Sequence, residues 1–504
     1  MKQRAYLLTL VLVLASAAAA RSQSPEPRTQ SPADQEPARP TQPQQRAKTP
    51  EGSEKKDQDQ PPLPPVVAGT SYDAPLTGAS QPIIGLVSSR SYILPSVFFY
   101  GQLDSNAFNV FGSGNFASIN TLMGSIAVQK VGRTTQLNLG YLAGRSISNR
   151  GGVLDSTMHD LAVSEMWSRG RWDGFILDKF LYSSQAALLG GATPFEVERL
   201  NTVAGLADTG PVVLRNSFLP GQGIFTAFGP RLNNALVAQV NNHLSRRTFF
   251  TVVGNYNILS FFHSNLIDSA SAGLQTGIGY QRSRKDTFAV VYRFNDLWFS
   301  GLPVSVRDNV FEAAYQRQLG ERLLFQAGAG PEISFIQAPM VSGTTQSQSS
   351  DTRVSWTADA LLHYQLRRDL GFSAGYTHAL TNGGGVFLGA ITDRVSAGVN
   401  LQVSRDWTVS VTSAYAHNQN LIPLPNATTA TVAAPANATF DSIYGGFEAR
   451  RRVGRDSEIF FGYLGRYQTA SFTFCPAGIC QGNNIVGHQF NFGFAWHLRA
   501  VPIG

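Results

Sequence analysis

Charge is the main shortage in this 504-residue sequence, because Asp, Glu, Lys and Arg make up only 14% of the chain, against about 25% in typical soluble proteins. Glu and Lys are too scarce, and the 48 glycines too many, for a coiled coil. The mean hydropathy of −0.09 is far below that of a helical membrane protein. Aromatic residues, at 11%, are too frequent for a disordered chain. What remains is a β-rich protein with few charges.

The first 20 residues have the three parts of a secretory signal. Lys2 and Arg4 supply positive charge, an apolar run follows from Tyr6 to Ala15, and Ala18-Ala19-Ala20 forms an A-x-A cleavage pattern. The apolar run is short for a bilayer-spanning helix. No cysteine lies nearby, which argues against a lipoprotein anchor. We therefore predict a signal peptide at residues 1–20 and an exported mature chain.

Residues 21–90 have a different composition from the rest of the chain. Between Arg21 and Thr70 lie 11 of the 26 prolines, many Gln and Ser, and no aromatic residue. Such a segment cannot bury enough apolar surface to offset its ordering entropy. We predict a Pro-rich, disordered periplasmic extension, which is either a tail that reaches a partner or an inert spacer.

Cysteine is also scarce, and the only two residues, Cys475 and Cys480, occur in the sequence Cys-Pro-Ala-Gly-Ile-Cys. A zinc site would need further ligands nearby, and this segment contains none. In an exported chain two such thiols can close a small disulfide at the tip of a loop. We predict that Cys475 and Cys480 form a disulfide.

From about residue 96 onward, segments of ten or more residues alternate between apolar and polar side chains. In the last segment Phe490, Phe492, Phe494 and Trp496 fall on one phase, and Gln489, Asn491, Gly493 and Ala495 on the other. This two-residue period is that of a β-strand with unlike faces. The segment 171–182 is an exception, because Asp178 and Lys179 place charges on both phases; a bulge is expected there.

The connections between these segments alternate in length. Eight are short and mostly basic, and nine longer ones lie near residues 106–117, 147–157, 185–232, 261–269, 299–305, 337–351, 382–390, 420–438 and 473–483. Seventeen connections imply eighteen strands. The short connections are Lys130 to Arg133, Ser168 to Arg171, Ser245 to Arg247, Ser283 to Asp286, Leu319 to Arg322, Arg367 to Asp369, Ser404 to Asp406 and Val453 to Asp456.

This pattern predicts an all-β fold: a transmembrane antiparallel up-and-down β-barrel of about 18 strands over residues 91–504. Bacterial outer-membrane barrels have even strand numbers, short periplasmic turns and longer outer loops. We therefore expect the bacterial outer membrane as the location, with both termini in the periplasm. A soluble β-sandwich or propeller is the alternative, but it would not require strict alternation of short and long connections.

Three segments resemble uncharacterised porin-like outer-membrane β-barrel proteins of diderm, Gram-negative bacteria. They are Leu219 to Asn234, Asn234 to Phe261, and Thr381 to Ala390, which reads Thr-Asn-Gly-Gly-Gly-Val-Phe-Leu-Gly-Ala. The final strand also resembles the targeting signal of porin-like barrels, although Arg499 to Gly504 follow it. The resemblance implies the location, the fold and the barrel-assembly machinery as a partner. It implies little about a substrate.

No motif in the sequence indicates catalysis. The eight histidines lack metal-ligand spacing, and Gly-x-Ser-x-Gly, Cys-x-x-Cys and His-Glu-x-x-His are absent. We expect no enzyme, no catalytic or metal site and no cofactor. We do not expect a siderophore-type receptor, because the residues before the first strand are too few and too polar for a plug in a barrel of about 22 strands.

A pore is the remaining use of an eighteen-stranded barrel, because its lumen is too wide for side chains alone to fill. We predict a porin-like channel for passive passage of hydrophilic solutes, with the 185–232 connection either folded into the lumen or capping the outside. Strand phase predicts seven pore-lining residues, which would set ion selectivity or pair with one another across the wall. They are Arg293, Glu312, Glu332, Asp359, Glu448, Arg450 and Arg466.

Two other functions stay open from the sequence. The barrel can belong to exopolysaccharide export, where its basic turns and Pro-rich extension would meet an acidic cargo or a periplasmic export partner. It can also be a structural or adhesive surface barrel. The basic turns fit contact with outer-membrane lipids best. We expect no nucleic-acid partner, and the sequence does not indicate an oligomeric state.

Overall fold

The computed structural model describes residues 91–107, 116–150, 155–183, 230–262, 267–320, 322–342, 345–381, 387–422, 438–454, 456–471 and 484–503. Every regular element within these residues is a β-strand, as the sequence predicts. The strands are β1 Tyr92–Asp104, β2 Ala117–Val131, β3 Thr135–Ser148, β4 Ser156–Arg169, β5 Trp172–Ser183, β6 Arg231–His243, β7 Thr248–Phe261, β8 Ser269–Gln281, β9 Asp286–Phe299, β10 Ser305–Leu319, β11 Leu323–Ser342, β12 Thr345–Arg367, β13 Leu370–Thr381, β14 Ala390–Gln402, β15 Trp407–Asn420, β16 Thr439–Val453, β17 Ser457–Ala470, β18 Asn484–His497 and β19 Val501–Pro502.

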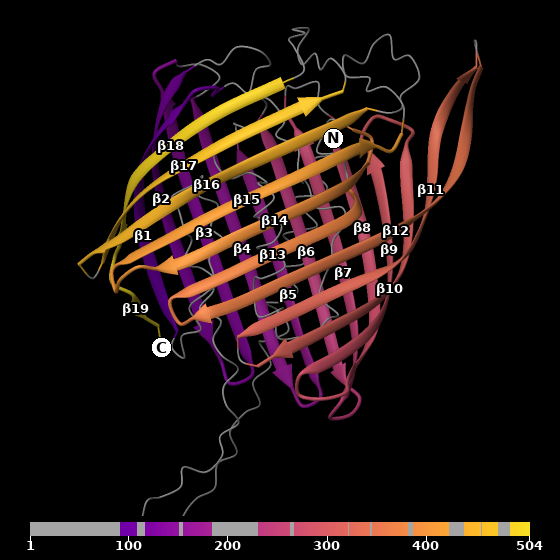
Figure 1. Cartoon of the computed structure of the whole chain (residues 1–504), viewed down its shortest axis with the longest axis horizontal. Helices are drawn as coiled ribbons and strands as arrows, with labels where there is room; N and C mark the ends of the chain where they lie inside the picture. Colours follow the sequence, from indigo (N-terminus) through magenta and orange to yellow (C-terminus); the bar gives the residue numbers. More distant parts are fainter. Residues whose placement is uncertain are drawn as a thin grey trace, which may run out of the picture. The chain divides into compact units, whose positions relative to one another are not determined.

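The strands form one closed barrel in which neighbours in sequence pair antiparallel (Figure 1). The ring closes where β1 pairs with β18, from Ser96 opposite His497 to Asp104 opposite Gln489. The short β19 extends this seam, with Val501 opposite Ile93. The predicted transmembrane up-and-down barrel of eighteen strands is confirmed, and β19 is an addition that the sequence did not indicate.

Large apolar side chains cover the outer face of the barrel. In β18, Phe490 is 53% exposed and Trp496 43%, and in β9 Val290 is 67% exposed. Water-facing surfaces do not carry a continuous belt of this kind, because exposing it would cost too much free energy. The belt is the surface that contacts the hydrocarbon of a membrane.

The eight predicted short connections are all present and lie at one end of the barrel, which we call the short-turn end. Each joins two strands through two to four residues. Gly170 and Gly454 have φ angles of 65° and 75° in these turns, a left-handed conformation that glycine adopts without a Cβ clash. The first residue of β1 and the last residues of β18 and β19 lie at the same end. The opposite end is the long-loop end.

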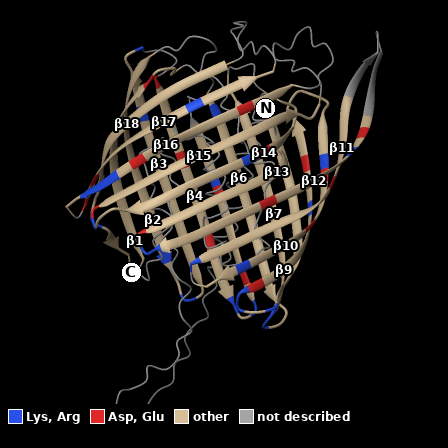
Figure 2. Cartoon of the chain, viewed as in Figure 1, with Lys and Arg blue, Asp and Glu red and all other residues tan. Residues whose placement is uncertain are grey.

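Basic residues gather at the short-turn end, as Figure 2 shows. These residues belong mainly to the short turns. Because the turns do not pack against a core, charged side chains are tolerated there. The residues are Lys130, Arg133, Arg169, Arg171, Arg246, Arg247, Arg282, Arg284, Lys285, Arg322, Arg367, Arg368, Arg405, Arg451 and Arg452.

One predicted long connection is wrong. Residues 337–351 belong to a hairpin in which β11 and β12 remain paired up to Ser342 opposite Thr345. The ends of these two strands project beyond their neighbours (Figure 1). The sequence from Thr345 to Ser350 is polar on both phases, so a strand that continues past the apolar belt loses the alternation by which it is recognised.

The bulge expected near Asp178 is also absent. Strand β5 pairs without interruption with both β4 and β6. Asp178 therefore lies on the outer face with Ile176, and Lys179 on the inner face. The Nδ2 atom of Asn234 donates a hydrogen bond to Oδ1 of Asp178 at 2.7 Å, which lowers the cost of placing a carboxylate on an apolar surface.

Candidate functional site

Burial separates the two faces of each strand and identifies the inner wall. In β18, Gln489 and Asn491 are 0% and 3% exposed, whereas Phe490 between them is 53% exposed. The buried phase of a closed barrel faces its interior. We call the side chains on this phase the inner wall, and it is the surface that a solute inside the barrel would contact.

Uncharged polar residues on the inner wall form hydrogen-bonded ladders. The Nε2 atom of Gln239 donates to Oδ1 of Asn241 at 2.9 Å, and the hydroxyl of Thr251 donates to the same oxygen at 2.8 Å. The hydroxyls of Thr121 and Ser146 lie 2.8 Å apart on β2 and β3. Such bonds satisfy polar groups that are shielded from bulk water and hold the wall in one conformation.

Arg466 of β17 connects the inner wall across the seam. Its Nη1 and Nη2 atoms donate to Oδ2 and Oδ1 of Asp104 on β1, each at 3.0 Å. Nη2 also donates to the backbone oxygen of Asn106 at 2.7 Å. The side chains of Arg466 and Asp104 are 4% and 0% exposed. This is a buried bidentate ion pair, the strongest geometry available to arginine and carboxylate.

A second charged group lies on β9, β10 and β11. The Nη2 atom of Arg293 is 3.6 Å from Oε2 of Glu312, and the hydroxyl of Ser334 donates to Oδ1 of Asp308 at 3.1 Å. Glu332 occupies the neighbouring inner position of β11. All four ionisable residues are at most 4% exposed. This group therefore contains three carboxylic groups and one guanidinium.

A third group lies near the short-turn end and is more open. The Nε atom of Arg450 donates to Oε1 of Glu448, and its Nη1 donates to Oε1 of Glu458 on β17 at 3.2 Å. The side chains of Arg450 and Glu458 are 16% and 24% exposed. Two carboxylates and one guanidinium interact here, and Arg452 lies opposite Glu458 in the strand register.

All seven predicted residues lie on the inner phase. Six of them fall into the three groups just described. The seventh, Asp359 of β12, is partly buried and shares its phase with the buried Thr357. Arg293, Arg450 and Arg466 each pair with a carboxylate on a neighbouring strand or across the seam. That the seven side chains line an open pore stays a prediction.

The inner ionisable residues missed from the sequence include Asp104, Asp308 and Glu458, and also Asp160, Arg231 and Arg394. Asp308 is four residues before Glu312 on the same strand, and strand phase alone identifies it. Asp104 is harder to identify because Phe98 and Tyr100 point inward while Val97 and Phe99 point outward. Strand β1 is therefore apolar on both faces over these positions, and its phase cannot be read from the sequence.

Several predicted features lie outside the described residues. They are the signal peptide at 1–20, the extension at 21–90, nearly all of the 185–232 connection, and both Cys475 and Cys480. Among the residues that the structure does describe, no helix is long and apolar enough to cross a membrane. Within the same residues, no three His, Cys, Asp or Glu side chains come together in a way that could hold a metal ion.

No protein-family model matches the chain, and no curated protein matches its sequence. Solved structures to which it is similar include OccK2 (OpdF) of Pseudomonas aeruginosa, with 8% identity over 81% of this chain and 98% of that chain at a TM-score of 0.40. The ferric-catecholate import receptor Fiu of E. coli K12 has 9% identity over 82% of both chains, with a TM-score of 0.40. OpdO of Pseudomonas aeruginosa has 8% identity over 82% and 98%, also at 0.40. Because these TM-scores are low, the fold is assigned from the strand pairing of this chain and not from these similarities.

Proposed function

We propose that the chain is a porin-like outer-membrane channel through which small hydrophilic solutes pass passively, without catalysis. The observation that carries this proposal is the contrast between the two faces of a closed eighteen-stranded wall. The outer face is apolar, whereas the inner wall carries amides, hydroxyls and paired charges beside apolar clusters such as the one at Phe98, Tyr100 and Leu181. A barrel of this strand number encloses more space than its own side chains fill. A polar lining in that space favours water and hydrophilic solutes.

We further propose that the short-turn end faces the periplasm. In outer-membrane barrels the short turns are periplasmic and the longer loops external. The basic side chains of the short turns are then placed against phospholipid head groups, which attract arginine and lysine when they are anionic. Both ends of the described chain lie at this end, so the predicted signal peptide and extension would precede the barrel on the periplasmic side.

The proposal is tested by planar-bilayer recording of the purified full-length protein. We expect stepwise increases in conductance as single barrels insert, because an aqueous lumen conducts ions. Insertion is checked separately by the heat-dependent gel mobility of the folded barrel. A correctly folded and inserted barrel that conducts no current would contradict the channel function.

Ion selectivity offers a second test, based on the group at Glu448, Arg450 and Glu458. Replacing Glu458 by Gln removes one negative charge and leaves Glu448 paired with Arg450. Because fixed charges along a lumen enrich ions of opposite sign, we expect the reversal potential in a salt gradient to shift toward lower cation preference. Asp369→Asn is the matched control, since Asp369 is exposed in a turn beside Arg367. Equal shifts in the two variants would refute a role for Glu458 in the lumen.

A further inference from the structure

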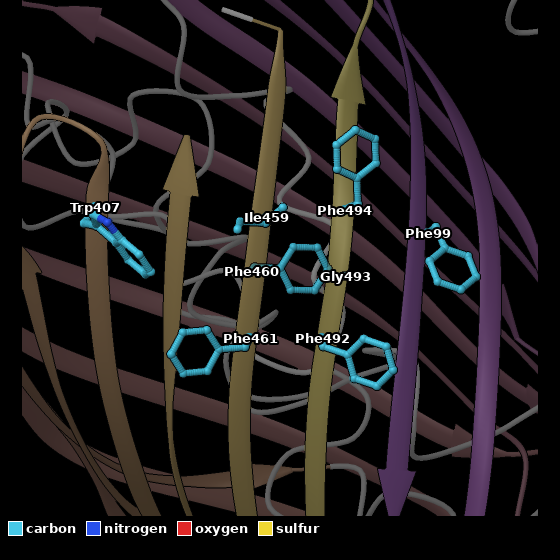
Figure 3. A pocket seen from close by; sticks show the side chains of 8 residues that line it. All are labelled: Phe99, Trp407, Ile459, Phe460, Phe461, Phe492, Gly493 and Phe494. Carbon is cyan, nitrogen blue, oxygen red and sulfur yellow. The ribbon is translucent and has the colours of Figure 1, made fainter. Parts of the chain in front are cut away.

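The outer face of the barrel is hollowed beside the seam. A trough of about 390 Å³ runs over β17 and β18, between the outward side chains of Ile459 and Phe461 on one strand and Phe492 and Phe494 on the other. Figure 3 shows these side chains with Trp407 at one side and Phe99 at the other. Every residue that lines the trough is aromatic, aliphatic or glycine. Its lining therefore offers no polar side chain to a polar ligand, apart from the indole of Trp407.

The trough exists because its side chains diverge. The rings of Phe461 and Phe492 point away from each other, as Figure 3 shows. The ring of Phe492 occupies the space over Gly101, where a Cβ atom would collide with it. Gly493 reaches the trough with its backbone only, because its Cβ position is on the inner face, where it would collide with the buried Phe460. The hollow is thus built into the packing of the two strands.

A basic group lies at the short-turn side of the trough. Trp407, the first residue of β15, is opposite Arg451 of β16 in the strand register. The guanidinium carbon of Arg451 is 5.5 Å from the centroid of the Trp407 ring, a cation–π distance that restrains the arginine. Arg405 precedes Trp407 by two residues in the same turn. The apolar trough therefore adjoins the positive charge of Arg451 at the membrane boundary.

We propose that this trough binds one anionic glycerophospholipid, with an acyl chain lying between Phe461 and Phe492 and the phosphate beside Arg451. The lining and its position in the apolar belt favour a hydrocarbon chain over other occupants. The guanidinium of Arg451 provides bidentate donors for phosphate, and its charge favours a lipid with a net negative head group. The inference rests on the proposed membrane orientation, because the periplasmic leaflet is where a phospholipid would reach Arg451.

Native mass spectrometry of the full-length protein in a neutral detergent tests this site. Phosphatidylglycerol and phosphatidylcholine with identical acyl chains are added in turn, and the retained lipid is counted. We expect preferential retention of one phosphatidylglycerol. Arg451→Gln should lower that retention about fivefold, since one arginine near a head group contributes about 1 kcal/mol. Arg284→Gln, in a basic turn at the other side of the ring, is the matched control and should retain phosphatidylglycerol as the unaltered protein does.

The trough itself is tested by Ile459→Trp, which fills it without introducing charge. We expect this variant to lose both lipids, whereas Arg451→Gln loses only the anionic preference. Equal retention of the two lipids by the unaltered protein, or equal losses in Arg451→Gln and Arg284→Gln, would overturn the proposal. Unchanged retention of the lipids by Ile459→Trp would also overturn the proposal. A barrel that is silent in bilayers but prefers phosphatidylglycerol would contradict the channel function alone.

Discussion

Replacing Asp104 by Ala is expected to lower the free energy of unfolding by about 3–5 kcal/mol, because it leaves a buried arginine without its counter-ion. Arg466 donates both terminal nitrogens to this carboxylate, and its side chain is only 4% exposed. The pair joins β17 to β1 across β18, so its loss acts on the seam where the barrel closes. Urea unfolding of the barrel in lipid vesicles, followed by tryptophan fluorescence, measures the change.

Two further variants separate the charge effect from simple loss of contacts. In Asp104→Ala/Arg466→Met the unpaired charge is gone, and we expect much of the lost stability to return. Asp369→Ala removes an exposed ion pair with Arg367 and should cost at most about 1 kcal/mol. If Asp104→Ala and Asp369→Ala destabilise the barrel equally, the seam pair does not have the role assigned to it.

Most of the strands could be predicted because a membrane wall imposes unlike environments on alternate residues. From Gln489 to Trp496 in β18, Phe and Trp alternate with Gln, Asn and small residues, and the observed burial follows this alternation. Strand β12 shows the limit of this signal. Beyond the apolar belt both of its faces are polar, so the sequence predicts a loop where the backbone continues to pair.

Charged side chains show a second limit of strand phase as a predictor of which face a residue occupies. Asp178 lies on the outer face of β5, where an apolar residue is expected, and its carboxylate is hydrogen-bonded by Asn234 of the next strand. The sequence suggests a bulge because it does not show that a neighbour can satisfy the carboxylate in place. The alternation within one strand therefore does not predict the position of a charged side chain whose hydrogen-bond partner belongs to a neighbouring strand.

The inner wall was predictable by position but not by partner. Strand phase assigns Glu312 and Arg466 to the inner face, because a charge on the outer face is costly, and both residues are buried. The partner of Arg466 is Asp104, which is 362 positions away in the sequence. Their contact depends on the register with which β1 meets β18, and that register follows from closing the whole ring. No pattern within a single strand contains this information.

A charge introduced into the middle of the apolar belt is expected to destabilise the barrel strongly. Leu274 lies near the middle of β8, points outward and is 49% exposed. Leu274→Arg should lower the free energy of unfolding in lipid by about 2–4 kcal/mol, because the guanidinium must be taken into hydrocarbon or drawn away from it at the expense of lipid packing. Urea unfolding in vesicles measures this loss.

The matched control is Val453→Arg, which makes the same kind of change at a different depth. Val453 is 46% exposed on the outer face but is the last residue of β16, at the short-turn end. An arginine there reaches the head groups directly, and we expect a cost of about 0–1 kcal/mol. The difference between the two variants reports membrane depth rather than the loss of an apolar side chain, because both replace an aliphatic residue of similar exposure. Equal costs at the two positions would contradict a membrane-spanning wall centred near Leu274.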